Sequence, residues 1–555
     1  MNHCLKTADS NCKNCYKCIR NCPIKALRMT DEQAHIIRDE CVLCGECYVV
    51  CPQNAKQIRN DTDKVLSLID SGREVIISLA PSYAAWYRDF TLADVEKAAK
   101  KIGFSGCEET AKGALAVKLE YEKLVGERKT NVIISSCCHS VNLLIEKHFS
   151  AAVKYMANVV TPMMAHGKMI KEEKPDAAVV FVGPCISKKA EIEKYPDVID
   201  VALTFEEFDE MLSSAKVEIT KTDAISSKCL TNLFPTSGGV LATMEKDPNF
   251  NYLVIDGTAK CIEALAEIEN GNLKNCFIEM SSCSGSCTEG PLMKKHLHNP
   301  LACNVSVHKD VLKEHYDIKE GLPLNREFTF EGKTTVMPGS AAIEEVLRKM
   351  GKTSPEKHLN CGSCGYNTCR EKAIAVLQGK ADISMCLPYI KEKSESFSDT
   401  IIKNTPNGIL VLDEQFSISL INGSARRIFN IPNSADLIGS PVVRLLDPTD
   451  YINVQAMGKN VYANRKYLAE YEKYVEETII YDKEYHIIMI MMKDITDEEK
   501  SKQKRTVQGE AAVEITDKVI EKQMRIVQEI ASLLGETTAE TKIALTKLKE
   551  TLQDE

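Results

Sequence analysis

Two copies of one cysteine pattern, with the spacing Cys-x2-Cys-x2-Cys-x3-Cys-Pro, lie within residues 1–60 of the chain. The copies are Cys12, Cys15, Cys18, Cys22 and Pro23, followed by Cys41, Cys44, Cys47, Cys51 and Pro52. The first ten residues, MNHCLKTADS, lack the apolar segment of a secretory signal. A cytosolic chain keeps its thiols for metals or redox work rather than for structural disulfides. The duplicated pattern therefore predicts a metal-binding module.

The spacing resembles that of bacterial two-cluster ferredoxins, in which the fourth cysteine of each run binds the cluster of the other run. The resemblance implies one 4Fe-4S cluster on Cys12, Cys15, Cys18 and Cys51, and a second on Cys41, Cys44, Cys47 and Cys22. A pair of zinc sites is the alternative, because Cys-x2-Cys alone also suits zinc. The duplication with both prolines favours iron–sulfur clusters, which would carry electrons in series.

The 23 cysteines are unevenly distributed, since nineteen precede residue 304, four lie between 361 and 386, and none follows. Composition and patterning divide the chain into segments 1–60, 61–350, 351–396, 397–497 and 498–555. The net charge of −9 gives no footprint for nucleic acid. No apolar run approaches the roughly 20 residues that span a bilayer. We expect a multidomain α/β and α+β protein of an oxygen-poor cytoplasm, without nucleic-acid or membrane partners.

The second segment alternates apolar strands with helical patterns. The expected strands are 74–80, 131–136, 177–183, 198–204 and 276–282. Continuous Val/Ile runs separated by helices indicate a mainly parallel, buried sheet. Three cysteine loops follow such strands, namely SSCCHS (135–140), GPCISKKAE (183–191) and EMSSCSGSCTEG (279–290). Because ligands collect at the C-terminal edge of an open α/β sheet, these loops can bring distant cysteines to one metal site.

A 4Fe-4S cubane needs four thiolates, and the three loops supply Cys138, Cys185, Cys283 and Cys287, which leaves Cys137 over. Neighbouring side chains on a strand point to opposite faces. We therefore expect Cys137 and Cys138 to have different roles.

A second cysteine module consists of Cys361, Cys364, Cys369 and Cys386. Residues 370–385 read as a helix that carries the fourth cysteine back to the other three. Four thiolates and a tight loop at Gly365 favour another 4Fe-4S cluster, with zinc as the alternative. The pattern resembles the small cluster domain of corrinoid-linked and electron-transport proteins.

A two-cluster ferredoxin module followed by three such loops resembles FeFe hydrogenase, whose signatures are TSCCPxW, MPCxxKxxE and ExMxCxGGCxxGG. The resemblance covers roughly residues 1–350, with the three motifs in the correct order. It implies an α/β H-cluster domain that interconverts protons, electrons and H2. The H-cluster is a 4Fe-4S cubane joined by one cysteine to a diiron unit with CO, cyanide and azadithiolate ligands.

The resemblance also implies roles for individual residues. The four loop cysteines hold the cubane, and Cys287 is the bridge to the diiron unit. Cys137 matches the proton-relay thiol, and Lys188 matches the lysine that pairs with an iron-bound cyanide. Glu191 matches the acid that orients this loop, and Ser82 matches a donor to the second cyanide. A surface lysine is the alternative for Lys188, but a lysine with nearby donors stabilises cyanide charge in a dry pocket.

The loops depart from the family signatures around the diiron unit. His139 and Ser140 replace the Pro-x-Trp portion of the first signature. Gly183 and Ser281 stand where the second and third signatures have methionine, and Ser286 replaces a glycine. The loss of flexible apolar packers predicts a roomier, more polar pocket, a shifted cluster potential and slower turnover.

The proton path is also altered. The family's relay runs from the thiol through water to glutamates on a helix, which corresponds roughly to residues 114–124. Glu120 and Glu122 lie there, but outside the family's register. Glu289, two residues after Cys287, is a candidate substitute acid, and a solvated loop carboxylate is the alternative. This hypothesis predicts that Glu289→Gln slows turnover at least tenfold and leaves the cluster spectra intact.

Residues 397–497 resemble a PAS domain, with an Asp-Glu turn, an Ile-Asn-x-x-Ala helix start and a last strand ending in Asp-Ile-Thr. No His or Cys is placed for a cofactor, which favours signal relay. Apolar residues then recur at spacing seven, at Val513, Ile520, Val527 and Leu534. They favour a modest coiled coil over a solitary helix packed on its own domain. Gly535 is expected to end this helix, and a second begins near residue 537.

Three hypotheses remain. The chain is a sensory FeFe hydrogenase whose third cluster and PAS domain report to a partner, a catalytic hydrogenase whose tail assembles subunits, or a hydrogenase-like iron–sulfur protein without enzymatic activity. The retained Cys137, Lys188 and Cys287 argue against the last, and the PAS-plus-helix tail favours the first. The expected partners are H2, protons, an electron carrier such as ferredoxin, a second copy of the chain, and a kinase or phosphatase effector.

Overall fold

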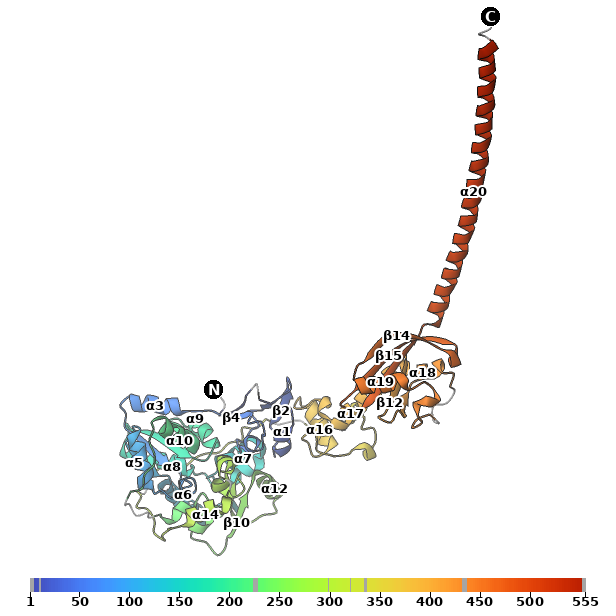
Figure 1. Cartoon of the computed structure of the whole chain (residues 1–555). Coiled ribbons are helices and arrows are strands. Elements are labelled where there is room, and N and C mark those ends of the chain that lie inside the picture. Colours follow the sequence, from blue (N-terminus) through green and yellow to red (C-terminus); the bar gives the residue numbers. More distant parts are fainter. Residues whose placement is uncertain are drawn as a thin grey trace. The chain divides into compact units, whose positions relative to one another are not determined.

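The computed structural model describes residues 4–8, 11–222, 228–297, 299–319, 321–333, 337–431 and 437–551. Its contacts divide the chain into two compact units, Met1–Ile390 and Lys391–Glu555 (Figure 1). All 23 cysteines belong to the first unit. The structural division therefore follows the uneven distribution of cysteine in the sequence.

The first unit begins with a small module of two strand pairs and two short helices. β1 (Leu5–Thr7) pairs antiparallel with β4 (Lys56–Ile58), and β2 (Leu27–Thr30) pairs with β3 (Gln33–Ile36). The helices are α1 (Lys17–Asn21) and α2 (Glu46–Val49), which carry Cys18 and Cys47. Each helix follows a residue with left-handed backbone, Tyr16 or Gly45, so the repeated sequence folds as a repeated structure.

Two parallel sheets form the centre of the first unit. The larger has the order β6 (Gly106–Glu109), β5 (Val75–Leu79), β8 (Ala178–Gly183) and β9 (Val201–Thr204). The smaller has the order β10 (Asn251–Asp256), β11 (Cys276–Ser281) and β7 (Val132–Ile134). Parallel pairing is confirmed, but the expected single sheet is two. β6 and β10 escaped prediction because β6 carries two glutamates and β10 is only partly buried.

Helices connect and cover these strands (Figure 1). They are α3 (Thr62–Asp70), α4 (Tyr83–Trp86), α5 (Leu92–Lys101), α6 (Ala111–Glu127), α7 (His139–His148), α8 (Pro162–Glu173), α9 (Ser187–Lys194), α10 (Phe205–Ser214), α11 (Gly239–Thr243), α12 (Thr258–Glu269), α13 (Pro291–His296) and α14 (Pro300–His308). The next helix, α15 (Ser340–Lys349), packs instead against α16 (Cys369–Leu377). Capping boxes at Thr91 and Thr204 fix the starts of α5 and α10, because side chain and backbone satisfy each other's hydrogen bonds there.

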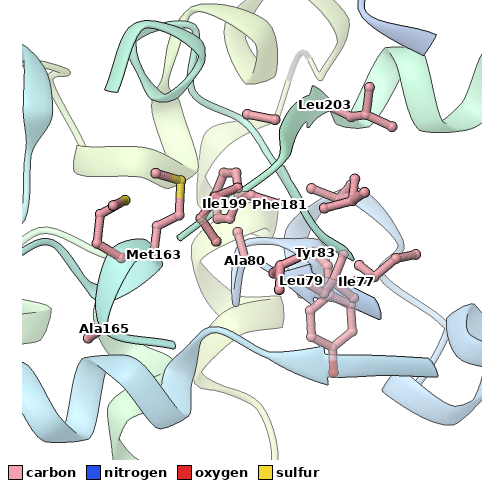
Figure 2. Close-up of a cluster of buried hydrophobic side chains, with 14 of the residues drawn as sticks. Ile77, Leu79, Ala80, Tyr83, Met163, Ala165, Phe181, Ile199 and Leu203 are labelled. Atoms are coloured by element: carbon pink, nitrogen blue, oxygen red, sulfur yellow. The ribbon is translucent and has the colours of Figure 1, made fainter. Parts of the chain in front are cut away.

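The core of the larger sheet supports the loops that follow its strands. Figure 2 shows Ile77 and Leu79 of β5 with Phe181 of β8 and Leu203 of β9, all buried. Every residue of β5 is buried, and Ser78 is the one polar residue in the strand. A densely packed strand holds the loop at its end in a fixed position.

A third cluster module ends the first unit and packs against the N-terminal module. It contains α16 (Cys369–Leu377) and the start of α17 (Leu387–Asn404). Arg20 donates to the carbonyl oxygens of Gly362 and Ser363, and Lys25 donates to that of Gly365 at 2.9 Å. The expected helix over 370–385 is shorter, because α16 ends at Leu377 and a turn follows.

The second unit is an antiparallel sheet flanked by helices, in accordance with the predicted α+β domain. Its strand order is β13 (Ile418–Ile421), β12 (Gly408–Leu412), β16 (Ile487–Asp494), β15 (Lys473–Asp482) and β14 (Val461–Leu468). The short helices are α18 (Gly423–Ile428) and α19 (Thr449–Met457). Asn422 accepts from the N–H of Ala425 and so caps α18, which explains the Ile-Asn-x-x-Ala pattern.

One long helix, α20 (Thr496–Thr551), closes the second unit. It continues through Gly535, so the expected break into two helices is wrong. Glycine costs a helix only about 1 kcal/mol relative to alanine, which good helix formers on both sides offset. The apolar residues at spacing seven are exposed on this helix. None of the helices that the structure describes is both long and apolar enough to cross a membrane.

Candidate active site and cluster sites

Loops from both parallel sheets line one cavity of about 110 Å³ at the C-terminal ends of their strands. Six of the predicted site residues line it, namely Ser82, Cys137, Cys138, Cys185, Lys188 and Cys287. Ala80, Met163 and Phe181, which are labelled in Figure 2, supply apolar wall. Residues far apart in the sequence therefore meet at the edge where α/β folds bind ligands.

The four predicted cubane cysteines are neighbours. Burial raises the pKa of Cys283 well above its usual value, and the nearby thiols Cys138, Cys287 and Cys185 raise it further. A set of buried thiols that disfavour one another's ionisation is stabilised when iron replaces their protons. Among the described residues, no three His, Cys, Asp or Glu groups approach closely enough to hold a single metal ion.

Neither cysteine of the SSCCHS loop lies on a strand. β7 ends at Ile134, and Cys138 is the N-cap of α7. The expectation that Cys137 and Cys138 point to opposite faces of a strand therefore does not apply. Both side chains line the cavity. Their environments still differ, because Cys138 accepts from the N–H of Ser282 at 3.5 Å whereas Cys137 lies 3.2 Å from the hydroxyl of Tyr121.

Lys188 and Glu191 form a buried ion pair beside the cavity. The Lys188 ammonium lies 2.6 Å from the Glu191 carboxylate, one helical turn later in α9. Burial would lower the pKa of Lys188, but Glu191 and Cys185 outweigh it and raise this pKa. Burial would likewise raise the pKa of Glu191, but Lys188 and His139 hold it at about 2. The pair therefore keeps a fixed positive charge at the cavity wall.

Two buried polar atoms at the cavity have no partner in the described structure. They are Oγ of Ser82 and Nδ1 of His139. Burial lowers the pKa of His139 to about 3, so its ring is neutral. Buried polar atoms are normally hydrogen-bonded, so two orphans beside four thiols and an ammonium fit a polar, anionic group such as the diiron unit with its cyanides.

The expected relay helix brings a tyrosine, not a glutamate, to the cavity. Tyr121 of α6 is buried and contacts Cys137. Glu120 pairs with Lys123, and Glu122 pairs with Lys118. A role for Tyr121 was not predicted from the sequence. Its position between Glu120 and Glu122 in the expected relay helix could have indicated one.

Sequence reasoning also missed Glu279, the first residue of the third loop signature. Its carboxylate accepts from the N–H groups of Gly238 and Leu241, each at 3.0 Å. Burial raises the pKa of Glu279 to about 7, and its charge would raise the pKa of Cys137. Glu279 is therefore a buried acid near the thiol.

Glu289 lies elsewhere. It lines a second cavity, of about 330 Å³, together with Cys283 of the third loop, Cys44 of the N-terminal module, Lys260 and Lys294. The structure does not bring Glu289 to the cavity of Cys137. It does bring one predicted cubane ligand and one predicted ferredoxin ligand to the same space.

The N-terminal cysteines have the surroundings of cluster ligands. Cys41 accepts from the N–H of Leu43 at 3.4 Å, and Cys51 accepts from the N–H of Ala55 at 3.3 Å. Such N–H···S bonds stabilise thiolates. Burial raises the pKa of Cys18, Cys22, Cys41, Cys44 and Cys47.

The third cluster module, which contains the second cysteine pattern, surrounds a cavity of its own. Cys361, Cys364, Cys369 and Cys386 all line this cavity. Lys372 lines it too and is fully buried, and burial lowers the pKa of this lysine to about 8. Lys352 is a second buried lysine in this lining. The four thiols and two lysines suit a cluster that carries net negative charge.

Comparisons with known families divide the chain in the same way. Residues 11–55 match the 4Fe-4S dicluster domain, and residues 73–291 match the C-terminal domain of the iron-only hydrogenase large subunit. Residues 358–388 match an Fe-S cluster family, and residues 396–501 match the PAS fold. The matches to cluster families favour iron–sulfur clusters over the zinc alternatives.

Individual relatives match short parts of the chain. One component of an ion-translocating oxidoreductase complex of Methanosarcina acetivorans is 42% identical over 48 residues, which are 9% of this chain and 18% of that protein. An uncharacterized ferredoxin of Methanocaldococcus jannaschii is 35% identical over 52 residues, 9% of this chain and 84% of that protein. The N-terminal module therefore belongs to the ferredoxins.

Solved structures match at low identity. A FeFe-hydrogenase variant from Chlamydomonas reinhardtii shares 12% identity at a TM-score of 0.39, covering 50% of this chain and 100% of that one. The PAS domain of an HTR-like protein from Haloarcula marismortui shares 17% identity at a TM-score of 0.16, covering 19% of this chain and 95% of that one.

Fold, cysteine sites and family matches define an iron–sulfur protein with an H-cluster-type domain. More narrowly, the chain is a PAS-containing FeFe hydrogenase-like protein. The resemblance inferred from its motifs is confirmed at this level.

Proposed function

We propose that the chain catalyses the reversible reaction 2 H⁺ + 2 e⁻ = H2 at an H-cluster. The observation that carries the proposal is the cavity at the ends of both sheets, where Cys137, Lys188 and the bridging Cys287 meet. The diiron unit, when bound, supplies the metal that binds hydrogen and the amine that exchanges protons with the protein. The non-enzymatic alternative has no use for this combination of thiol, ammonium and unpartnered donors.

Each residue has a definite task in this proposal. Cys138, Cys185, Cys283 and Cys287 would hold the cubane, and Cys287 would be the ligand that the cubane shares with the diiron unit. Lys188, kept charged by Glu191, binds one cyanide. The unpartnered hydroxyl of Ser82 donates to the other. Cys137 holds a proton at Sγ and passes it to or from the bound amine. The apolar wall excludes water, which strengthens these interactions.

Electrons follow a line of three further 4Fe-4S clusters. The cavity shared by Cys283 and Cys44 joins the cubane to the nearer ferredoxin cluster. The contacts of Arg20 and Lys25 with the loop 362–365 join the ferredoxin module to the third cluster module. A soluble carrier such as ferredoxin exchanges electrons with this line.

Infrared spectroscopy of the full chain loaded with synthetic diiron cofactor tests the proposal. We expect CO and cyanide bands that shift when N2 is replaced by H2. Unloaded protein supplies the control, because it contains the cysteines and the iron–sulfur clusters but no source of these bands. Absence of the bands after loading would leave the non-enzymatic hypothesis.

We further propose that turnover is slow and reports H2 or redox state through the PAS domain to a kinase or phosphatase effector in an anaerobic cytoplasm. The altered loop residues His139 and Ser281 support slow turnover, and the PAS fold after the third cluster module supports signalling. The exposed apolar residues of α20 support dimerisation with a second copy.

Light scattering tests the dimer. The full chain is expected to be dimeric, whereas a chain ending at residue 504 is expected to be monomeric with its infrared bands intact. A monomeric full chain contradicts the dimer, and turnover comparable to bulk H2-producing enzymes favours the catalytic alternative, in which the tail only assembles subunits.

A further inference from the structure

The proton path beyond the cavity does not follow the expected helix, because Tyr121 rather than a glutamate contacts Cys137. The Tyr121 hydroxyl also contacts Ser136, whose Oγ donates to the backbone carbonyl oxygen of Val159. Because this series of hydrogen bonds ends at a carbonyl oxygen, it does not lead protons to the surface. Another group at the cavity wall must then pass protons to the surface.

Thr110 is such a group. It lines the cavity and is the N-cap of α6, yet its side chain makes no capping hydrogen bond. Threonine at an N-cap normally accepts from the first turn of the helix. Here its Oγ1 instead lies 2.8 Å from Oγ of Ser78, the polar residue of β5. The hydroxyl has been turned from the helix towards the sheet.

The chain of hydrogen bonds continues from Ser78 to a buried histidine. Oγ of Ser78 lies 2.8 Å from Nδ1 of His166 in α8. On the other side of the ring, Nε2 has no hydrogen-bond partner in the described structure and lies 3.6 Å from Oε2 of Glu108, just beyond hydrogen-bond distance, so a small movement of either side chain closes the gap. His166 is fully buried, whereas the Glu108 side chain is 31% exposed and pairs with Lys112. Three polar side chains thus connect Thr110 at the cavity with solvent.

Helix packing fixes the histidine in this position. Gly113 of α6 lies against α8 so closely that a Cβ there would come within 2.5 Å of the backbone nitrogen of His166. This glycine lets the helices approach, and α8 then directs His166 towards β5. Met163 and Ala165 of the same helix pack into the core shown in Figure 2.

We propose that Thr110, Ser78, His166 and Glu108 form a proton wire between the active-site cavity and the surface. During H2 evolution, the Glu108 carboxylate takes a proton from solvent and passes it to Nε2 of His166, while Nδ1 gives one to Ser78. Ser78 gives its proton to Thr110, and Thr110 gives its own to water or Cys137 in the cavity. Each group gains one proton and loses one, and Glu108 returns to its ionised form.

The imidazole suits this task because it accepts on one nitrogen while it donates from the other. Burial lowers the pKa of His166, so the ring rests neutral and gives up an acquired proton readily. After each proton transfer the ring carries its proton on Nε2 instead of Nδ1. The ring must therefore turn over before it can transfer the next proton. A buried ring turns slowly, in keeping with slow turnover. The wire rests on the proposed hydrogenase function and supplies its protons.

The test uses the loaded full-length protein with Thr110→Val and His166→Ala, and Thr243→Val as control. Thr243 is a buried threonine whose hydroxyl bonds to a backbone carbonyl outside the wire. We expect Thr110→Val and His166→Ala to slow H2 evolution at least tenfold, and the control to match the wild type. Added imidazole is expected to restore part of the loss in His166→Ala.

Infrared spectra separate the wire from a structural role. The variants should show wild-type band positions and the same final distribution of cluster states under H2, reached at least tenfold more slowly. Shifted bands or a changed distribution indicate packing and overturn the wire. Unchanged rates with intact bands also overturn it and favour a route through Glu279. A wild type without CO and cyanide bands overturns the proposed function and, with it, the wire.

Discussion

The third cysteine loop, residues 279–290, contributes to two cavities whose linings differ in polarity. Cys287 lines the smaller cavity, whose walls include Ala80, Met163 and Phe181. Cys283 lines the larger one, which also holds Glu289, Lys260 and Lys294. Apolar walls strengthen electrostatic interactions with a bound group, whereas charged walls stay hydrated. Under the proposed function, this difference would confine hydrogen chemistry to the first cavity and leave the second for electron transfer from the ferredoxin module.

Removal of a cubane ligand should have the largest effect. We expect Cys138→Ala to lose the cubane and all CO and cyanide bands, because the diiron unit would be attached to the chain through the cubane. Iron analysis of the loaded protein should show the loss of about six iron atoms per chain, four from the cubane and two from the diiron unit. Cys261→Ala is the matched control, since Cys261 is buried in α12 and lines neither cavity. Intact bands in Cys138→Ala would place the cubane elsewhere.

Cys137→Ala should separate chemistry from assembly within the smaller cavity. The variant is expected to retain all of its iron and its infrared bands. Turnover should fall about 100-fold, the usual effect of removing a positioned proton-transfer group. Gas chromatography of evolved H2 beside iron analysis provides the measurement. A variant with nearly normal turnover would mean that protons reach the cavity without this thiol.

Motifs predicted which cysteines come together better than they predicted the groups around them. Cysteine spacing predicts a cluster because four thiolates at fixed separations have few other uses. It cannot tell that α6 presents Tyr121 to Cys137, since one residue of helical register decides which side chain points inward. Nor can it find β10, which carries no cysteine and whose apolar run, residues 252–255, is only four residues long. The separation of Glu289 from Cys287 arises from a tight turn, Ser286–Glu289, that spacing along the chain does not reveal.

The buried ion pair offers a prediction about stability. A carboxyl whose pKa falls from its ordinary 4.5 to about 2 on folding contributes about 3 kcal/mol to the free energy of unfolding. Because the folded pKa is the lower one, this contribution is present above pH 4.5 and is lost as the pH falls towards 2. Glu191→Gln should therefore lower the free energy of unfolding in urea at pH 7 by about 3 kcal/mol.

Glu193→Gln, on the same helix, supplies the control for the ion pair. Its carboxylate is about one-third exposed, and pairs of this kind contribute less than about 1 kcal/mol. Equal losses in the two variants would show that the cavity side of α9 holds no special charge. A larger loss for Glu191→Gln supports a fixed positive charge on Lys188 at the wall of the cavity that Cys137 lines.

Glu289→Gln has the smallest expected effect and decides whether the two cavities really divide their work. The sequence hypothesis expects at least a tenfold loss of turnover. Because the carboxylate shares a cavity with Cys283 and Cys44 rather than with Cys137, we expect a change of less than about threefold, below the range for a proton-transfer group. Removing one negative charge beside the clusters should instead raise their reduction potentials by tens of millivolts.

Redox titration followed by electron paramagnetic resonance and infrared spectroscopy measures both quantities for Glu289→Gln. Lys260→Gln is the matched variant of opposite charge, and it should lower the same potentials. A tenfold loss of turnover without a shift in potential would show that protons also enter through the charged cavity. In that case the loop would not separate protons from electrons, and Glu289 would belong with Cys137 in the path of the proton.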